Sequence, residues 1–312
     1  MKYVIIGAGG TGGILGFYMK KAGKDVTFIA RNKHLEAIKK NGLSVEKMWE
    51  NTTETIPIAA ESMESFAGEA DVIFVCVKKY SLDACIPWIQ KIAGKETIVI
   101  PILNVYGTGG YLQERLPGIL VTDGCIYVSA NIKEPGALLQ HGEILRVFFG
   151  VRRPEELGEG EKYLPVLKKI EEDLKESHID GILTDQIQRD AMVKFSYVSP
   201  IGTAGLFLNV TAGDFQKEGE ARELFQTMVQ EIVMLSHAMG LEFEEDLVKR
   251  NLKIVEGLAP ETTTSMQRDV MEGKKSEIDG LVYEVVRLAE HYHIRVPAYE
   301  KAAETFRKKG IE

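Results

Sequence analysis

The sequence predicts an α/β protein with an N-terminal doubly wound parallel sheet of the Rossmann type and an all-helical C-terminal domain. In the first half of the chain, short β-branched runs alternate with helical stretches, which is typical of parallel strands joined by helices. From about residue 163 the pattern becomes helical, and after residue 181 no convincing strand remains. A chain of 312 residues exceeds one such unit, so we expect two domains sharing a cleft, residues 1–180 and 181–312.

A glycine-rich turn joins the first strand, residues 3–6, to a helix over about residues 10–22. It matches the pattern G-x-G-x-x-G in its required context, as Gly7, Ala8, Gly9, Gly10, Thr11 and Gly12. The first glycine of the pattern permits the tight turn, the second lets backbone N–H groups approach a pyrophosphate, and the third lets the helix lie close to the strand. The helix N-terminus adds partial positive charge. A turn without a ligand explains five glycines among residues 7–13 poorly, so we predict that these residues bind a dinucleotide.

The end of the second strand indicates which dinucleotide is bound. NAD-binding chains usually place an acid there to accept hydrogen bonds from the ribose 2′-hydroxyl. This chain has Ala30-Arg31-Asn32-Lys33 instead, two cations and no acid. A guanidinium matches a 2′-phosphate through paired, charge-assisted hydrogen bonds, so Arg31 favours NADP(H) over NAD(H). Lys33 is either a second phosphate ligand or a solvated lysine at a helix start.

Further elements follow from short apolar runs. Strands are predicted at 25–30, 72–77, 97–103 and 118–121, and the runs 126–128, 137–139 and 147–149 are expected to extend the same sheet. In the second domain, apolar residues recur at three- and four-residue spacing before a helix stop at Gly240, namely Leu224, Met228, Ile232, Leu235 and Met239. They predict a core helix, and a second helical pattern covers residues 281–289.

Composition and charge limit the kinds of molecule that the protein can bind. The formal charge of −8 and the pI near 5.5 exclude a face-wide basic stripe for nucleic acid. No window approaches the 18 apolar residues of a membrane span and the chain enters a strand at once, so we expect a soluble, cytoplasmic protein with no signal peptide and no membrane partner. The three cysteines are interpreted as reduced packing residues, and the six histidines form no pattern that implies a metal.

Polar residues at strand ends are candidates for the site, because ligands of open α/β sheets bind beyond the carboxyl ends of the strands. Lys78 follows the strand 72–77 directly and is expected in the dinucleotide crevice, with Lys79 outside it. Asn104 ends the strand 97–103 and is a candidate to hydrogen-bond the substrate or the nicotinamide amide. Two plain alternatives stay open, an exposed loop lysine for the first and a turn asparagine for the second.

Lys194 is the candidate proton donor. If residues 187–198 form a helix, Ile187, Ala191, Lys194 and Val198 form one stripe, which sets the ammonium among apolar neighbours. Such a lysine either extends its amine to solvent or takes part in catalysis. Burial lowers a lysine pKa toward the range useful for proton donation.

Two further candidates lie near the C-terminus. Ser265 stands before a short helix that ends by Gly273, where its default role is that of an N-cap. Glu277 falls on the stripe of Leu281, Val285 and Leu288 in the next helix. It is either a first-turn acid favoured by the helix dipole or a carboxylate that pairs with an inward lysine.

Taken together, these motifs resemble the ketopantoate reductase family, the 2-dehydropantoate 2-reductases, across essentially the whole chain. The matching features follow the family's order: the glycine loop, Ala30-Arg31 followed by His34-Leu35, Val75-Cys-Val-Lys78, Asn104-x-x-Gly107, the helix of Lys194, and Ser265-Met-Gln-x-Asp269 with Glu277-Ile-Asp279. The resemblance implies NADPH-dependent reduction of 2-dehydropantoate to pantoate in pantothenate biosynthesis.

The resemblance also implies roles for single residues. Lys194 would protonate the ketone oxygen as hydride arrives, and Glu277 would hold and tune that lysine. Ser265 and Asn104 would contact the substrate, and Lys78 would help to place cofactor and substrate. Asn104 and Glu277 are expected to contact the cofactor as well.

One departure from the family bears on the substrate. The best-known members carry asparagines one and two helical turns after the lysine, suited to ketopantoate's hydroxyl, where this chain has Val198 and Gly202. An apolar site selects weakly for a hydroxyl, so another branched or aromatic 2-oxo acid is the alternative substrate. Ser196, Tyr197 and Ser199 could partly compensate, although they lie off the Lys194 stripe.

A non-catalytic dinucleotide sensor is the alternative of a different class. The inward Lys194 and Glu277 argue against it, because a pure binder does not need an inward ammonium. The expected assembly is a monomer or a homodimer that acts on a small-molecule 2-oxo acid.

Overall fold

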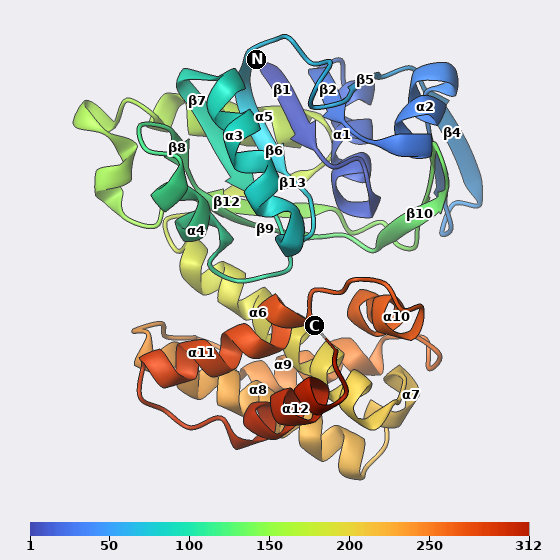
Figure 1. Ribbon diagram of the computed structural model, residues 1–312, viewed down its shortest axis with the longest axis vertical. Helices are drawn as coiled ribbons and strands as arrows, with labels where there is room; N and C mark the ends of the chain where they lie inside the picture. The colour runs from blue at the N-terminus through green and yellow to red at the C-terminus, as the bar shows by residue number, and fades with distance from the viewer. Residues whose placement is uncertain (312) are drawn as a thin grey trace. The chain divides into compact units, whose positions relative to one another are not determined.

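A computed structural model describes residues 1–311, and it divides the chain into two compact units (Figure 1). Unit 1 comprises residues 1–103 and 107–187. Unit 2 comprises residues 104–106 and the chain from residue 188 onward. The short segment 104–106 therefore belongs to unit 2 by its contacts, although unit 1 lies on both sides of it in the sequence.

A six-stranded parallel sheet forms the centre of unit 1. Its strand order is β5-β2-β1-β6-β7-β8, with the bounds β1 Lys2–Ile6, β2 Asp25–Ile29, β5 Ala59–Glu61, β6 Ala70–Val75, β7 Ala93–Pro101 and β8 Leu120–Val121. All five pairings are parallel, and β1 lies between β2 and β6. The predicted doubly wound sheet is confirmed.

Helices cover both faces of this sheet, as parallel sheets require. Along β1, Tyr3 and Ile5 point into a core with α1 (Gly10–Lys21) and α5 (Leu164–Glu176). Val4 and Ile6 point into a second core with α3 (Leu82–Ile92) and α4 (Thr108–Arg115), because side chains alternate along a strand. The remaining helical segments of unit 1 are α2 Asn32–Asn41, η1 Lys79–Ser81, η2 Pro154–Leu157 and η3 Glu159–Glu161.

Two smaller sheets correct the prediction that the runs after residue 125 extend the main sheet. One has the order β10-β11-β3-β4, with β10 Ala130–Glu134, β11 Ala137–Gln140, β3 Leu43–Lys47 and β4 Thr52–Ile56. The other has the order β13-β12-β9, with β13 Asp180–Leu183, β12 Arg146–Gly150 and β9 Asp123–Tyr127. The connections from β8 to β11 are only one or two residues long, and such short connections cannot supply the long crossover that another parallel strand needs.

Strand β13 also bears on the predicted domain limit. The expected boundary at residue 180 falls on the first residue of this strand, which pairs with β12 in parallel. Residues 181–187 are therefore part of unit 1. The strand is only four residues long and includes a glycine, so its sequence signal is weak.

Unit 2 is helical in the part of the chain that the structure describes, as predicted. Its elements are α6 Ile187–Leu208, α7 Ala212–Phe215, α8 Glu220–Ala238, α9 Leu247–Glu256, α10 Ser265–Met271, the π-helical segment η4 Asp279–Tyr283, α11 Glu284–His291 and α12 Pro297–Lys308. The helix predicted from the spacing of Met228, Ile232 and Leu235 is α8, and these three side chains are fully buried. Gly240 follows it with a φ of 80°, as a helix stop requires.

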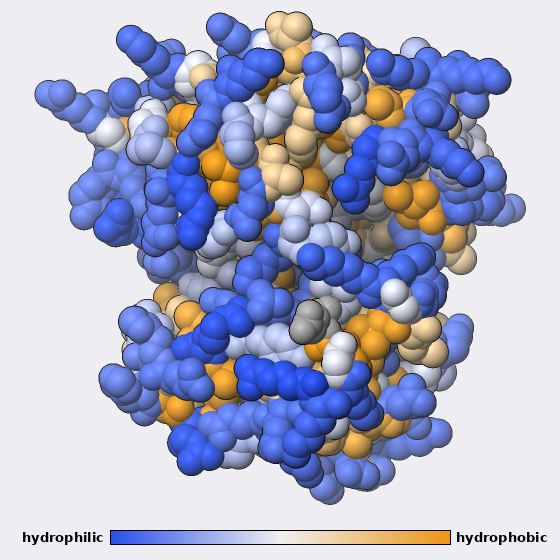
Figure 2. Space-filling model, in the orientation of Figure 1, coloured by the Kyte–Doolittle hydropathy of each residue, from blue (hydrophilic) through white to orange (hydrophobic). Residues whose placement is uncertain are grey.

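Helix α6 is long and apolar enough to cross a membrane, contrary to the expectation that no window reaches this length. Of its most apolar window, 61% is buried inside the protein. The core helix of a soluble protein has the same character. Hydrophilic residues predominate on the face of each unit drawn in Figure 2.

A buried carboxylate ties α5 to the parallel sheet. Asp173 accepts hydrogen bonds from the Tyr3 hydroxyl on β1 at 2.6 Å and from the Lys24 ammonium at 2.8 Å. Lys169 lies 3.2 Å from the same carboxylate. Burial alone would raise the pKa of Asp173, but these three donors outweigh it and hold the pKa below its ordinary value. The carboxylate therefore stabilises the folded state in its charged form.

We expect Asp173→Asn to lower the free energy of unfolding at pH 7 by about 1–3 kcal/mol, because an amide cannot satisfy all three donors. Since the folded state depresses this pKa, the carboxylate contributes stability above its ordinary value of 3.8 and loses it as the pH falls through the lowered value. The deficit of the variant in urea unfolding should shrink as the pH falls below the ordinary pKa of 3.8 and through the lowered one. Glu172→Gln, on the exposed side of α5, is the control; an equal deficit there would contradict the role of Asp173.

Candidate active site

The three glycines of the G-x-G-x-x-G pattern are required for different reasons. Gly7 has a φ of 101° and donates its N–H to Ile29 O at 2.9 Å, which makes the tight turn after β1. A Cβ at Gly12 would lie 2.1 Å from Gly7 O, so only glycine lets α1 pack against the strand. A Cβ at Gly9 would meet no protein atom within 4 Å. Gly9 therefore leaves open space in front of the turn.

The N-terminus of α1 is suited to an anion. Gly9 is its N-cap and provides no side-chain cap, and the first turn has no acidic residue. The first N–H groups of a helix need acceptors, and they carry partial positive charge. The open space at Gly9 and these N–H groups fit a pyrophosphate, so the residues present fit a dinucleotide.

The predicted cations follow the end of β2, which is hydrogen-bonded to the glycine loop through Gly7 N–H and Ile29 O at 2.9 Å. Arg31 is the N-cap of α2 and Lys33 lies in its first turn, which has no acidic residue. Both side chains are exposed and available to a ligand. A ribose phosphate bound here would lie near the positive charges of Arg31 and Lys33, with no acidic residue in the first turn of α2.

His34 is a loop-positioning residue that the sequence pattern did not assign. Its Nδ1 accepts a hydrogen bond from the Gly136 N–H at 3.0 Å, so the proton of a neutral ring lies on Nε2, which donates to Ala8 O at 2.8 Å. The ring thus joins the glycine loop to the turn between β10 and β11. Its position in the first turn of α2, three residues after Arg31, is the signal that could have identified it.

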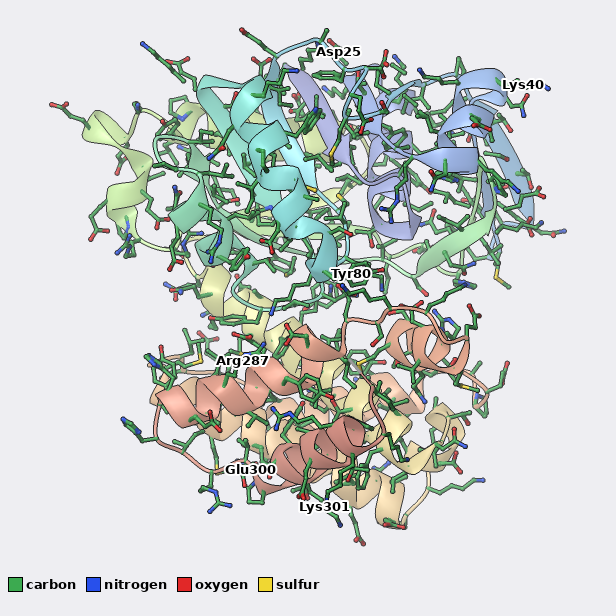
Figure 3. All side chains as sticks on the ribbon, in the orientation of Figure 1. Asp25, Lys40, Tyr80, Arg287, Glu300 and Lys301 are labelled. Atoms are coloured by element: carbon green, nitrogen blue, oxygen red, sulfur yellow. The ribbon has the colours of Figure 1, made fainter. Side chains whose placement is uncertain are left out.

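Lys78 lies at the carboxyl end of β6, the position that the sequence predicted. It is the N-cap of η1, with extended backbone (φ −71°, ψ 149°), and two residues separate it from the end of the buried strand β6. Figure 3 shows Tyr80 at this edge of the sheet and Asp25, the first residue of β2, at the opposite edge. Lys78 and Lys79 are both half-buried, so burial does not separate the two lysines.

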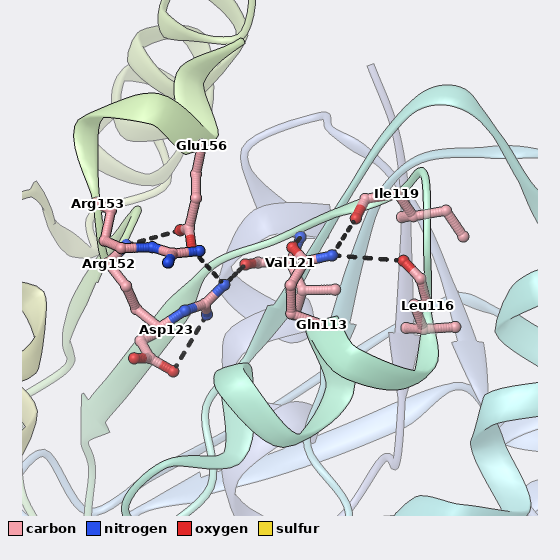
Figure 4. Close-up of polar contacts among 8 residues, drawn as sticks. All are labelled: Gln113, Leu116, Ile119, Val121, Asp123, Arg152, Arg153 and Glu156. Carbon is pink, nitrogen blue, oxygen red and sulfur yellow. Dashed lines mark hydrogen bonds and ion pairs between the residues drawn. The ribbon is translucent and has the colours of Figure 1, made fainter.

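A buried ionic cluster anchors the chain that follows Asn104 (Figure 4). The Gly109 N–H, at the start of α4, bonds to the buried carboxylate of Asp123. Arg152 lies 3.6 Å from Asp123 and donates to Val121 O at 2.8 Å and to Glu156 at 3.1 Å. Burial raises the pKa of Asp123, and Arg152 opposes that rise. The cluster fixes the start of α4, and no sequence pattern indicated it.

In unit 2, the structure brings Lys194 and Asn104 into direct contact. The Lys194 ammonium donates a hydrogen bond to Asn104 Oδ1 at 2.7 Å. Lys194 is only 8% exposed, so its amine does not extend into solvent. Of the two interpretations of this lysine, the inward one describes the structure.

The two C-terminal candidates also lie in unit 2. Glu277 is 4% exposed and immediately precedes the helical segment that continues through η4. Ser265 is the first residue of α10, but the N-cap is Thr264, which forms a capping box with Gln267. The default role of N-cap therefore does not apply to Ser265.

The positions where the family carries asparagines are apolar. A Cβ at Gly202 would lie 3.1 Å from Met266 Cε and 3.6 Å from Thr264 Oγ1, so α10 occupies the space next to that glycine. Ser196 and Ser199, the expected compensating hydroxyls, donate instead to Val193 O and Leu281 O. They are held by backbone carbonyls and fully buried.

This combination of a dinucleotide-type loop and a buried lysine is typical of dinucleotide-dependent oxidoreductases. Residues 3–153 match the family model of ketopantoate reductase PanE/ApbA, and residues 186–310 match the model of its C-terminal domain. The chain therefore belongs to the ketopantoate reductase family.

Individual relatives agree with this assignment. The uncharacterized oxidoreductase YkpB of Bacillus subtilis is 24% identical over 96% of both chains. A 2-dehydropantoate 2-reductase of Mesorhizobium japonicum is 26% identical over 100% of this chain and 98% of its own. The structure of a D-mandelate dehydrogenase with NADH and anilino(oxo)acetate has the same fold, with a TM-score of 0.86 at 21% identity over 99% of this chain and 98% of that one.

Proposed function

We propose that this protein reduces a 2-oxo acid to a 2-hydroxy acid with NADPH. The observation that carries the proposal is the buried Lys194 ammonium held by Asn104 at 2.7 Å. Reduction of a ketone places negative charge on its oxygen, and a positioned ammonium stabilises that charge and supplies the proton. A dinucleotide sensor has no need of such a group.

In this proposal unit 1 holds the cofactor. Gly7, Ala8, Gly9, Gly10, Thr11 and Gly12 cradle the pyrophosphate against the N-terminus of α1, where the space at Gly9 is open. Arg31 and Lys33 bind the 2′-phosphate, and Lys78, Asn104 and Glu277 contact the cofactor further along. Bound there, NADPH supplies a hydride.

Residues of unit 2 provide the substrate chemistry. Lys194 donates a proton to the ketone oxygen, while Asn104 Oδ1 holds one of its N–H groups and so directs the others. Glu277 tunes the lysine, and Ser265 contacts the substrate from the first turn of α10. The protein acts on this small molecule in the cytoplasm as a monomer or a homodimer.

The leading substrate is 2-dehydropantoate, since the relatives that match nearly the whole chain include a 2-dehydropantoate 2-reductase. A specific observation favours a second candidate, a branched or aromatic 2-oxo acid. Val198 and Gly202 offer no hydrogen-bonding side chain, and Met266 packs beside Gly202. Selection for a substrate hydroxyl should therefore be weak.

A matched pair of substrates tests the reaction and the selection together. 2-Dehydropantoate and 3,3-dimethyl-2-oxobutanoate differ only in one hydroxyl group. We expect both to be reduced with NADPH, with kcat/KM values within about 200-fold of each other, because an apolar pocket discriminates by no more than this. A preference of about 10⁴-fold for 2-dehydropantoate would instead show a site built for the hydroxyl. Phenylglyoxylate extends the panel to aromatic substrates, and no turnover of any 2-oxo acid would refute the proposed function.

Lys194→Ala should lower kcat by about 10²- to 10⁴-fold, the usual contribution of a positioned general acid. The Kd for NADPH, measured by the change in its fluorescence, should stay within about threefold, because the glycine loop is untouched. Lys217→Ala removes an exposed lysine of the same unit and serves as the control. Unchanged turnover in the Lys194 variant would remove this lysine from the mechanism.

Arg31→Ala should raise the KM for NADPH by about 10- to 100-fold and that for NADH by less than about threefold, because only NADPH carries a 2′-phosphate. The comparison is made in steady-state kinetics with one 2-oxo acid at saturation. Lys40→Ala, at the opposite end of α2, is the matched control for loss of one positive charge. Equal losses with both cofactors would contradict the proposed phosphate contact.

A further inference from the structure

Helix α6 runs without interruption through Pro200, six residues after Lys194. Proline has no N–H, so the carbonyl four residues earlier, that of Ser196, loses its helical donor. That carbonyl lies in the interior, because both Ser196 and Pro200 are buried. A buried carbonyl without a donor is unfavourable, and the structure must supply one from elsewhere.

The donor comes from α9. Asn251 Nδ2 lies 2.9 Å from Ser196 O and 3.0 Å from Ser196 Oγ, and it donates to both. Asn251 is fully buried. One amide group therefore replaces the N–H that Pro200 removes from the helix.

The oxygen of the Asn251 side-chain amide indicates that this position requires a hydrogen-bond donor. Asn251 Oδ1 is buried, and within residues 1–311 no hydrogen-bond donor reaches it. The opposite amide orientation would set Oδ1 against the Ser196 carbonyl oxygen, which is repulsive. The position therefore uses the donor and leaves the acceptor unpaired.

The turn held in this way is the one that carries Lys194. Ser196 Oγ donates to Val193 O at 2.8 Å, so Asn251 contacts the carbonyl and the hydroxyl of a residue that closes the turn 193–196. Just before the proline, Ser199 Oγ donates to Leu281 O in η4, and Thr203 Oγ1 donates to Ser199 O. The residues next to the proline thus have an anchor of their own, and Asn251 is the anchor of the turn 193–196.

We propose that Asn251 is a positioning residue, which supplies the Ser196 carbonyl with the donor that Pro200 removes and so fixes the turn that presents the Lys194 ammonium. This inference rests on the proposed role of Lys194 as proton donor. Asn251 itself touches neither substrate nor cofactor in this proposal. Its loss should therefore lower kcat and leave NADPH binding unchanged.

A double-mutant cycle tests the inference in the full-length protein. Asn251→Leu, of similar volume but without a donor, should lower kcat about tenfold, with the Kd for NADPH within twofold of wild type. In the Pro200→Ala background, the backbone N–H of residue 200 again reaches Ser196 O, so adding Asn251→Leu should change kcat by less than twofold. The effect of Asn251→Leu is expressed as the ratio of kcat values with and without this substitution in each background. Any effect of Pro200→Ala alone cancels in the comparison of the two ratios. The loss in Tm caused by Asn251→Leu should likewise be smaller in that background.

Gln216→Leu is the matched control, because Gln216 Nε2 also donates to backbone carbonyls, those of Val255 and Leu258 at the far end of α9. Its effects should be the same with and without Pro200. Equal losses of kcat from Asn251→Leu in both backgrounds, or no loss in the wild-type background, would overturn the inference. If the wild-type protein reduces no 2-oxo acid, the proposed function fails independently of this inference. The Tm values of the double-mutant cycle then test the hydrogen bond between Asn251 and Ser196 O on their own. Additive losses in Tm would overturn the inference.

Discussion

A buried ammonium is the constraint on which unit 2 depends. Removing a charged amine from water is unfavourable unless it is paired or hydrogen-bonded, and Asn104 Oδ1 provides such a partner for Lys194 at 2.7 Å. Asn104 reaches this position from the end of β7, in a short segment whose chain on both sides belongs to unit 1. The Asp123 cluster fixes the start of α4 on one side of this segment. The lysine and its partner amide therefore come from parts of the chain that are 90 residues apart.

The glycine loop shows how packing and ligand binding make different demands on one motif. Gly12 is needed by the protein itself, because a Cβ there would overlap Gly7 O at 2.1 Å. Gly9 is not needed for packing, since a Cβ would meet no protein atom within 4 Å. A residue that packing leaves unconstrained is better explained by a ligand. His34 then adds a polar link from the loop to the turn at Gly136, so the loop is fixed from the side of α2 as well.

Local patterns in the sequence were sufficient for the parallel sheet and the glycine loop, because each depends on residues close together in the chain. For Lys194 they left open whether the amine extends to solvent, and the structure places it inward. The assignment of β9, β11 and β12 to the main sheet was wrong, since strand pairing depends on distant partners such as β3 and β13. The pairing of Lys194 with Asn104, 90 residues away, lay beyond any local pattern, although both residues were candidates separately. His34 and Asn251 were assigned no role because a single polar residue in a helix is usually a surface residue. The individual roles of Lys78, Ser265 and Glu277 stay predictions.

The packing of α10 on α6 depends on two glycines of α6. Gly202 and Gly205 let α10 approach closely: Met266 packs beside the first, and the Gln267 side chain lies 2.7 Å from the place of a Cβ at the second. Gln267 also completes the capping box with Thr264 and donates to Val210 O, so α10 is held at both ends of this contact. A side chain at position 202 would have to displace the end of the Met266 side chain, whose Cε lies 3.1 Å from the place of the Cβ. The small residue there is thus part of how the two helices pack, and this packing leaves the position without a hydrogen-bonding group.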